Sequence, residues 1–303
     1  MPTQSPSPAQ LEKESQLAEW FRAHGSVLVG FSGGVDSAYL ACVAVDALGP
    51  ERVLAVIGRS ATYPEAQWVR AREVAARFAI PVLEVATDEL ADPRYAANPI
   101  NRCYFCKNEL WSRLEPVAAE RGLAVIVDGT NADDRGDHRP GMLAARERSV
   151  ASPLAELGFT KDDIRTLSHR RGIPTWSQPS SPCLASRLPY GTEVTPERLD
   201  KVEHAEASLR ALGISGNLRV RFFGEKAKVE LDADELAEWQ REPRFTQLER
   251  AVLAAGFEEV ELDPRGFRSG ALNRLAGIVI SGPNDRDGIV ASAPNDRDGT
   301  VRR

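Results

Sequence analysis

Three of the four cysteines in this 303-residue chain stand in settings that suit sulfur or metal chemistry. Cys103 and Cys106 form a CxxC pair, whose spacing predicts that both sulfurs lie on one side of a turn. Such a pair can bind zinc with further ligands, form a redox couple, or remain two reduced thiols. Cys183 follows Pro182 among serines, which predicts an exposed loop, and Arg187 can stabilise its thiolate.

Three thiols, two of them paired, also match the ligand count of a [4Fe–4S] cluster with one open iron. Four cysteines are the usual ligand set, so three leave a coordination site that an external sulfide can occupy. A small zinc site or an unligated thiol pair is the alternative. The fourth cysteine, Cys42, lies in the apolar stretch ACVAVDAL, and we expect it to be a small buried packing residue.

A second chemical motif is the run SGGVDS, which follows an apolar segment and precedes a helical one. Glycines let main-chain N–H groups approach an anion, and the helix start adds free N–H groups and a positive dipole end. The run lacks the lysine of a GxxxxGK[ST] loop and is not GxGxxG. It therefore fits pyrophosphate, with a tight strand-to-helix turn as the alternative. The predicted binding residues are Ser32, Gly33, Gly34, Val35, Asp36 and Ser37.

Two further polar segments are candidates for ligand contact. Residues 128–134 (DGTNADD) follow another apolar strand, and open α/β sheets bind ligands beyond such strand ends. An ordinary Asn/Asp-rich turn is the alternative there. Arg219 and Arg221 alternate along a predicted strand, so both guanidiniums share a face that can clamp a phosphate or carboxylate, unless it is a solvated face. From the first segment we select Gly129, Thr130, Asn131 and Asp133 as contacts of the nucleotide or of Mg²⁺.

Alternating strands and helices must position these motifs. Short apolar runs predict strands at 26–32, 53–57, 81–85 and 124–127. Apolar residues at helical spacing predict helices at 11–24, 36–48, 64–78, 108–121 and 161–171. This alternation indicates right-handed βαβ units and a parallel sheet, an α/β fold.

The pattern changes in the last third of the chain. Helices at 196–212 and 245–255 and strands at 218–223, 228–231 and 258–262 predict a smaller α+β domain. We expect a disordered Pro/Ser-rich stretch at 1–10, the α/β domain at 11–190, a substrate-binding or oligomerisation domain at 191–278, and a disordered tail at 279–303 that repeats PNDRDG.

Composition narrows the class of protein. The 38 Lys+Arg and 44 Asp+Glu give a net charge of −6, which argues against a dedicated nucleic-acid binder. We see no signal peptide and no apolar run near the ~20 residues of a membrane span. Four cysteines are too few for a disulfide framework in a chain of this length, so we expect a reduced, cytoplasmic enzyme.

The SGGVDS loop resembles that of the N-type ATP pyrophosphatases, the PP-loop superfamily with an adenine nucleotide alpha hydrolase-like fold. The resemblance implies that ATP, with Mg²⁺, is cleaved between its α- and β-phosphates and that a substrate is adenylated. Five segments in one order narrow this further: SGGVDS, NRCYFCK, DGTNADDRGDHRPG, SPLAELGFTKDDIR and SPCLASRLPYGTEVT. Together, over roughly 11–278, they resemble the LarE family, ATP-dependent sulfur transferases of nickel-pincer nucleotide cofactor biosynthesis.

The resemblance implies that the carboxylates of pyridinium-3,5-biscarboxylic acid mononucleotide are adenylated and become thiocarboxylates. In single-cysteine members the residue matching Cys183 gives up its own sulfur and becomes dehydroalanine. In members with a CxxC, three cysteines hold a [4Fe–4S] cluster that carries sulfide. Since Cys103, Cys106 and Cys183 are all present, we expect the cluster type, and whether Cys183 is consumed stays open.

The family also implies that Arg219 and Arg221 bind the substrate phosphate, and we add Ser186 and Arg187 as substrate contacts. We expect an external sulfide source and a homo-oligomer. The main alternative is a PP-loop tRNA thiolation enzyme with a three-cysteine cluster, which the acidic balance disfavours. A nucleotide sensor without turnover and an ammonia-using synthetase are further alternatives, and the latter leaves the three cysteines unexplained.

Overall fold

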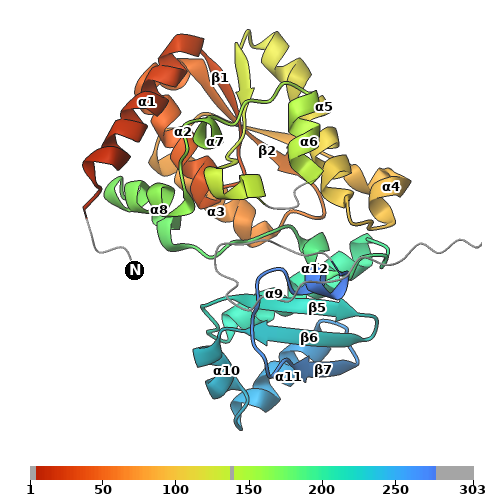
Figure 1. Ribbon diagram of the computed structural model, residues 1–303. Helices are drawn as coiled ribbons and strands as arrows, with labels where there is room; N and C mark the ends of the chain where they lie inside the picture. The colour runs from red at the N-terminus through yellow and green to blue at the C-terminus, as the bar shows by residue number, and fades with distance from the viewer. Residues whose placement is uncertain (1–4, 137–139, 278–303) are drawn as a thin grey trace, which may run out of the picture.

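The fold is given by a computed structural model, which describes residues 5–136 and 140–277. These residues form two lobes, each around its own sheet (Figure 1). The first lobe contains α1 (Pro8–His24), β1 (Val27–Gly30), α2 (Val35–Leu48), β2 (Val53–Arg59), α3 (Glu65–Arg77), β3 (Val82–Ala86), α4 (Pro93–Ala96), α5 (Arg102–Glu120), β4 (Val125–Val127), α6 (Pro140–Glu147), α7 (Pro153–Glu156) and α8 (Lys161–Arg170).

The first sheet is parallel, in the order β3–β2–β1–β4. Successive residues of β1 enter different cores: Val27 and Val29 pack with α1, α2, α3 and α8, whereas Leu28 packs with α5 and α6. This period of two is what a strand buried on both faces requires. The result is a three-layer α/β sandwich (Figure 1), which confirms the predicted fold class.

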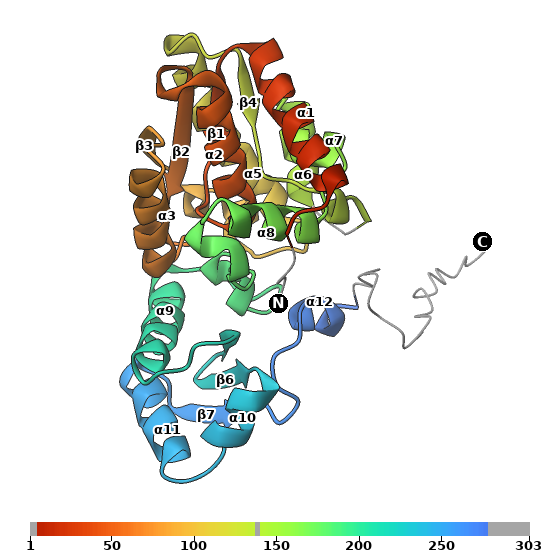
Figure 2. The ribbon, with the colours of Figure 1, turned by 90° about the vertical axis from the view of Figure 1, so that its left-hand side faces the viewer.

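The second lobe follows the first in the chain and lies below it in both views (Figure 2). In its sheet β5 and β6 are antiparallel and β6 and β7 are parallel. Its core is built from apolar residues of α9, α11 and the three strands, as predicted for a small α+β domain. Its elements are α9 (Pro196–Ala211), β5 (Leu218–Phe223), β6 (Lys226–Leu231), α10 (Ala233–Trp239), α11 (Arg244–Ala254), β7 (Glu259–Leu262) and α12 (Ala271–Leu275).

Some boundaries differ from the sequence expectations. Helix α1 starts at Pro8, inside the stretch expected to be disordered, because Ser7 forms a capping box with Gln10. Helix α5 starts at Arg102, six residues before the predicted helix, so the CxxC pair lies in its first turns. The predicted disordered tail, residues 279–303, lies entirely outside the described residues. Within the described ranges, no helix has the length and hydropathy needed to cross a membrane.

A buried carboxylate fixes α1 to the two helices that reach the glycine loop. Glu14 accepts hydrogen bonds from Tyr39 Oη of α2 at 3.2 Å and from Arg171 Nε, just after α8, at 2.5 Å. Arg170 of α8 pairs with the same carboxylate. Because Glu14 is buried, this network sets the relative position of α1, α2 and α8.

We expect Glu14→Gln to lower the free energy of unfolding by about 2–4 kcal/mol, because it removes the buried carboxylate that pairs with Arg170 and one of the two carboxylates that pair with Arg171. Glu12→Gln, on the exposed side of the same helix, should change it by less than about 0.5 kcal/mol. Urea unfolding of both variants measures the difference. Equal stabilities would show that the network does not anchor α1.

Candidate active site

The glycine loop closes on the start of α2. Gly33 has a φ of +68°, and the loop leads into α2 at Val35. Ser37 Oγ accepts from the Ser32 N–H at 3.3 Å and lies 3.2 Å from Ser32 Oγ. Ser37 Oγ also donates to the Gly34 carbonyl at 3.3 Å. The loop and the first turn of α2 thus form one hydrogen-bonded unit whose main-chain N–H groups suit an anion.

Helix α3 and Tyr63, which lies just before it, both hold the loop. Tyr63 Oη and Gln67 Nε2 both donate to the Ser32 carbonyl, each at 2.9 Å. A Cβ on Gly33 would lie 2.4 Å from the Cβ of Ala71, so only glycine fits there. A glycine is therefore required at this position for two reasons, the positive φ and the close packing.

The DGTNADD segment meets the loop, as its place at the end of β4 predicts. A Cβ on Gly129 would lie 3.0 Å from the Ser37 nitrogen, so the two backbones are in close contact. Asn131 Nδ2 reaches Asp36 Oδ1 at 3.5 Å. Thr130, by contrast, donates to Asp128 within the segment at 2.8 Å, and Asp133 accepts from the Lys161 N–H at 2.7 Å.

The structure adds Lys161, which the sequence analysis did not select. Its Nζ lies 2.5 Å from Asp36 Oδ2, although the two residues are 125 positions apart. Lys161 is the first residue of α8, after the capping-box residue Thr160. The loop therefore has a lysine beside it after all, supplied by another helix. The helix start in FTKDDIR was visible in the sequence, but its position against the loop was not.

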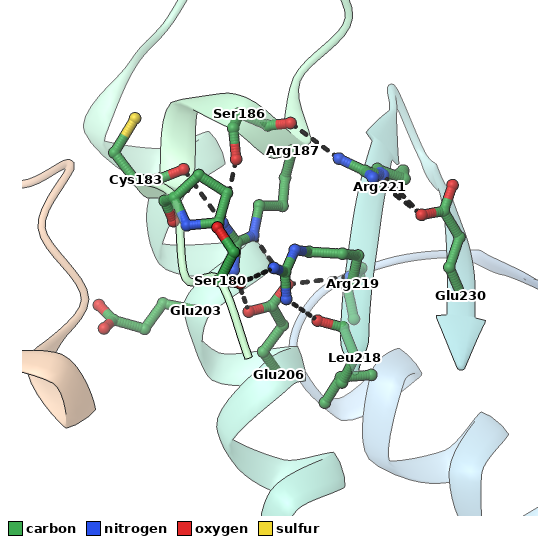
Figure 3. Close-up of polar contacts among 12 residues, drawn as sticks. Ser180, Cys183, Ser186, Arg187, Glu203, Glu206, Leu218, Arg219, Arg221 and Glu230 are labelled. Carbon is green, nitrogen blue, oxygen red and sulfur yellow. Dashed lines mark hydrogen bonds and ion pairs between the residues drawn. The ribbon is translucent and has the colours of Figure 1, made fainter. Parts of the chain in front are cut away.

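The Cys183 loop is held by a buried guanidinium (Figure 3). Arg187 is 2% exposed and pairs with both carboxylate oxygens of Glu206 at 2.9 Å. It also donates to the carbonyls of Pro182 at 2.6 Å and Cys183 at 3.1 Å. Arg187 thus positions the loop. Substrate contact by Ser186 and Arg187 remains a prediction.

The residues 60–63 join this loop to the glycine loop. The Leu184 N–H donates to the Thr62 carbonyl at 2.8 Å, while the next residue, Tyr63, binds Ser32. Thr62 Oγ1 donates to Glu89 at 2.5 Å. One short segment therefore contacts both the nucleotide loop and the thiol loop, and we call residues 60–63 the bridging segment.

Two of the three cysteines predicted to bind the cluster pack on the same hydrophobic core. Cys106 and Cys183 both contact the cluster that includes Tyr95, whereas Cys103 is exposed. Burial, followed by the charges of Glu89 and Cys183, raises the pKa of the Cys106 thiol well above its usual value. Within the described part of the chain, no three His, Cys, Asp or Glu residues form a group that could hold a metal ion.

Glu89 and Tyr95 are site residues that no motif in the sequence indicated. Glu89 is 3% exposed and accepts from Ser60 at 2.7 Å and from Thr62. The Tyr95 hydroxyl is buried and has no hydrogen-bond partner among the described residues. Cys42, in contrast, is a packing residue as predicted, and burial raises its pKa to about 12.

The two strand arginines are buried rather than solvated, and they have different partners. Arg221 pairs with Glu230 at 2.8 Å and donates to the Ser186 carbonyl at 2.9 Å (Figure 3). Arg219 donates to the carbonyls of Leu218 and Ser180. Burial and the charge of Arg187 lower the pKa of Arg219 to about 10. Of these two arginines, only Arg221 forms an ion pair with a carboxylate among the described residues.

We expect Gly33→Ala to weaken ATP binding at least tenfold and to cost about 2–4 kcal/mol of stability, from the φ penalty plus the clash with Ala71. Gly25 is the matched control, because its φ is +79° but no atom lies within 4 Å of a Cβ added there. Gly25→Ala should cost about 1 kcal/mol and leave ATP binding unchanged. ATP titration and urea unfolding measure both effects, and identical behaviour of the variants would contradict the proposed loop geometry.

Comparison with known proteins identifies one matching family profile and several relatives. The NAD synthase family profile matches residues 15–99, which hold the glycine loop and α3. An uncharacterized protein of Synechocystis sp. is 41% identical over 272 residues, 87% of this chain and 97% of its own length. The pyridinium-3,5-bisthiocarboxylic acid mononucleotide synthase of Lactiplantibacillus plantarum is 34% identical over 261 residues, 86% of this chain and 94% of its own.

A more distant match is the glutamine-hydrolyzing GMP synthase of Parafrankia sp., 31% identical over 216 residues, 62% of this chain and 40% of that protein. Its alignment covers a smaller share of this chain than the alignments with the two relatives above. The near-complete alignment with the mononucleotide synthase, together with the glycine loop, assigns the family. The chain belongs to the LarE family of PP-loop proteins.

Proposed function

We propose that this protein is an ATP-dependent sulfurtransferase that converts the carboxylates of pyridinium-3,5-biscarboxylic acid mononucleotide into thiocarboxylates. The observation that carries the proposal is the bridging segment, which contacts both the nucleotide loop and the Cys183 loop. A carboxylate that is activated at the first can be attacked by sulfur at the second. The name of the Lactiplantibacillus relative describes the product of such a reaction.

In the first step the substrate carboxylate attacks the α-phosphorus of ATP, an acyl adenylate forms, and pyrophosphate leaves. The N–H groups of the glycine loop and the start of α2 stabilise the pyrophosphate charge. Mg²⁺ suits the available carboxylates, Asp36 and Asp133, because it needs only one or two of them besides phosphate oxygens. Lys161 adds a positive charge beside the same site.

In the second step sulfur attacks the acyl carbon and AMP leaves. If Cys183 is the donor, its thiolate forms a thioester, the Cα proton is then removed, and the Cβ–S bond breaks. The products are a thiocarboxylate and dehydroalanine at position 183. Arg187, which binds the Cys183 carbonyl, fixes the loop for this attack.

We propose the cluster type, in which Cys103, Cys106 and Cys183 hold a [4Fe–4S] cluster and sulfide comes from outside the chain. The donor set fits the group chemically, since three thiols would leave one iron open. Cys106 is close enough to both other thiols for their charges to affect its pKa. Loading would require the three sulfurs to converge, because the described residues do not form a metal-binding group. In this type the chain supplies ligands and adenylates the substrate, and Cys183 is not consumed.

The second candidate, a tRNA thiolation enzyme, remains disfavoured by the net charge of −6. Affinity for tRNA that falls steeply with salt would favour it over the mononucleotide reaction. We also propose a homo-oligomer, which sedimentation would test.

We expect pyrophosphate release to depend on the pyridinium mononucleotide and to persist for a first turnover in Cys183→Ser, since adenylation needs no thiol. Thiocarboxylate formation should fall at least a hundredfold in this variant, because serine supplies neither sulfur nor a soft metal ligand. Cys42→Ala, a thiol removed from the first core, should retain both activities. Pyrophosphate release without the mononucleotide, or thiocarboxylate from Cys183→Ser, would contradict the proposal.

Anaerobic purification should give about four irons per chain, and Cys103→Ser or Cys106→Ser should abolish iron binding and sulfur transfer. Iron and sulfide analysis, followed by intact mass after turnover, measures this. Iron-free protein whose Cys183 loses hydrogen sulfide would instead establish the sacrificial route.

A further inference from the structure

Glu89 is a buried acidic residue to which the two proposed steps assign no role. It begins η2 (Glu89–Ala91), a single 3₁₀ turn between β3 and α4, and it is 3% exposed. Among the described residues its hydrogen-bond partners are the hydroxyls of Ser60 and Thr62, and no lysine or arginine forms an ion pair with it. A buried carboxyl group that is satisfied by the hydroxyls of one short segment points to a role in that segment.

Both hydroxyls bind the same oxygen of Glu89. Ser60 Oγ donates to Glu89 Oε1 at 2.7 Å, and Thr62 Oγ1 donates to it at 2.5 Å. The Thr62 N–H in turn donates to Ser60 Oγ at 3.2 Å, which closes residues 60–62 into a turn. One carboxyl oxygen therefore fixes the first three residues of the bridging segment in one conformation.

The turn that Glu89 holds carries both contacts of the bridging segment. The Thr62 carbonyl accepts from the Leu184 N–H at 2.8 Å, and Tyr63 Oη donates to the Ser32 carbonyl at 2.9 Å. Among the described residues, Glu89 forms no hydrogen bond to either loop itself. It acts on both loops through the segment that joins them.

The two loops depend on this turn to different degrees. The nucleotide loop has further support, because Gln67 of α3 also donates to the Ser32 carbonyl at 2.9 Å. The Cys183 loop is held by Arg187, whose ion-pair partner lies on α9, in the second lobe. The main-chain bond from the bridging segment instead ties this loop to the first lobe, where the nucleotide loop lies. Loosening the turn should therefore displace the thiol more than it disturbs the ATP site.

Glu89 also lies near the thiols, and its charge acts on them. Burial is the main cause of the raised pKa of the Cys106 thiol, and the charge of Glu89 is a smaller cause. For the bridging segment, by contrast, Glu89 Oε1 is the acceptor that Ser60 and Thr62 share. The geometry thus favours a role in positioning over a role through charge.

We propose that Glu89 is a positioning residue: through the bridging segment it keeps the Cys183 loop against the nucleotide loop, so that the acyl adenylate meets sulfur before it meets water. This inference rests on the proposed function. When the thiol site is displaced, water attacks the acyl carbon, AMP leaves, and the original carboxylate is recovered as the water gives up its protons. ATP is then cleaved without sulfur transfer, because a displacement of about 1 Å can cost about a hundredfold in rate.

The test compares Glu89→Ala with Glu89→Gln by the amount of thiocarboxylate formed per pyrophosphate released. Glu89→Ala removes the acceptor of both hydroxyls, so this ratio should fall about tenfold to a hundredfold, while pyrophosphate release with the mononucleotide changes by less than about threefold. Glu89→Gln keeps an acceptor oxygen without the charge, so the ratio should stay within about twofold of the wild type. Asp88→Asn is the matched control and should behave as wild type, because Asp88 is the exposed neighbour and its side chain does not cap η2.

A structural role alone would lower both activities together, because fewer molecules would be folded. Equal losses of pyrophosphate release and of thiocarboxylate in Glu89→Ala would therefore overturn the proposal. A Glu89→Gln variant as impaired as Glu89→Ala would overturn it as well, since the charge of Glu89 would then be required rather than its hydrogen bonds.

A third variant tests the path through the bridging segment. Thr62→Val replaces the hydroxyl by a methyl group and removes one of the two hydrogen bonds to Glu89. It should lower the ratio about threefold to tenfold in the wild type but no further in Glu89→Ala, because both changes break the same contact. Effects that multiply in the double variant would show that Glu89 acts by another route, and the proposal would be wrong.

Amide hydrogen exchange tests the positioning without the reaction. The Leu184 amide should exchange about tenfold faster in Glu89→Ala than in the wild type or in Glu89→Gln, because its acceptor carbonyl is no longer fixed. Unchanged exchange at Leu184 would overturn the proposal. If the wild type forms no thiocarboxylate from the mononucleotide, the proposed function fails together with the role of Glu89 in that reaction, whereas faster exchange at Leu184 would still show that Glu89 fixes the loop.

Discussion

The main-chain hydrogen bond from the Leu184 N–H to the Thr62 carbonyl connects the two halves of the proposed chemistry. An acyl adenylate is reactive toward water, so a nucleophile must be held next to the place where it forms. The bridging segment does this with few atoms, since Tyr63 binds the nucleotide loop while Thr62 binds the thiol loop. The surrounding structure keeps this segment and its two partners in place.

Buried charges do most of that positioning. Glu14 fixes the helices that carry Asp36 and Lys161, and the Arg187–Glu206 pair fixes the Cys183 loop. Burial by itself would raise the pKa of Glu206, but the paired Arg187 guanidinium and the other hydrogen bonds outweigh it and the pKa is lowered. The carboxylate therefore stays ionised. Paired charges of this kind specify geometry because breaking them leaves an uncompensated ion.

The strands and the glycine loop could be predicted because each depends on a short stretch of sequence. The strands came from apolar runs, and the glycine loop came from a backbone shape that few residues can adopt. Helix α5 was predicted too short because its first turn lacks apolar spacing and is held instead by Arg102, whose guanidinium donates to Asn98 at 2.6 Å. Lys161 and Glu89 could not be predicted, because their roles arise from contacts between segments far apart in the chain. The pairing of Arg221 with Glu230 likewise depends on strand register, which the sequence pattern of one strand does not contain.

The proposed chemistry has two parts: ATP activates a carboxylate, and three cysteines deliver sulfur to it from outside the chain. Isotopically labelled sulfide, supplied to anaerobically prepared protein with ATP and the mononucleotide, tests both parts together when the mass of the thiocarboxylate is determined. We expect labelled product that requires ATP, and a protein whose mass is unchanged after turnover. Unlabelled thiocarboxylate, with loss of hydrogen sulfide from Cys183, would show that the chain spends its own sulfur and that the cluster does not carry it.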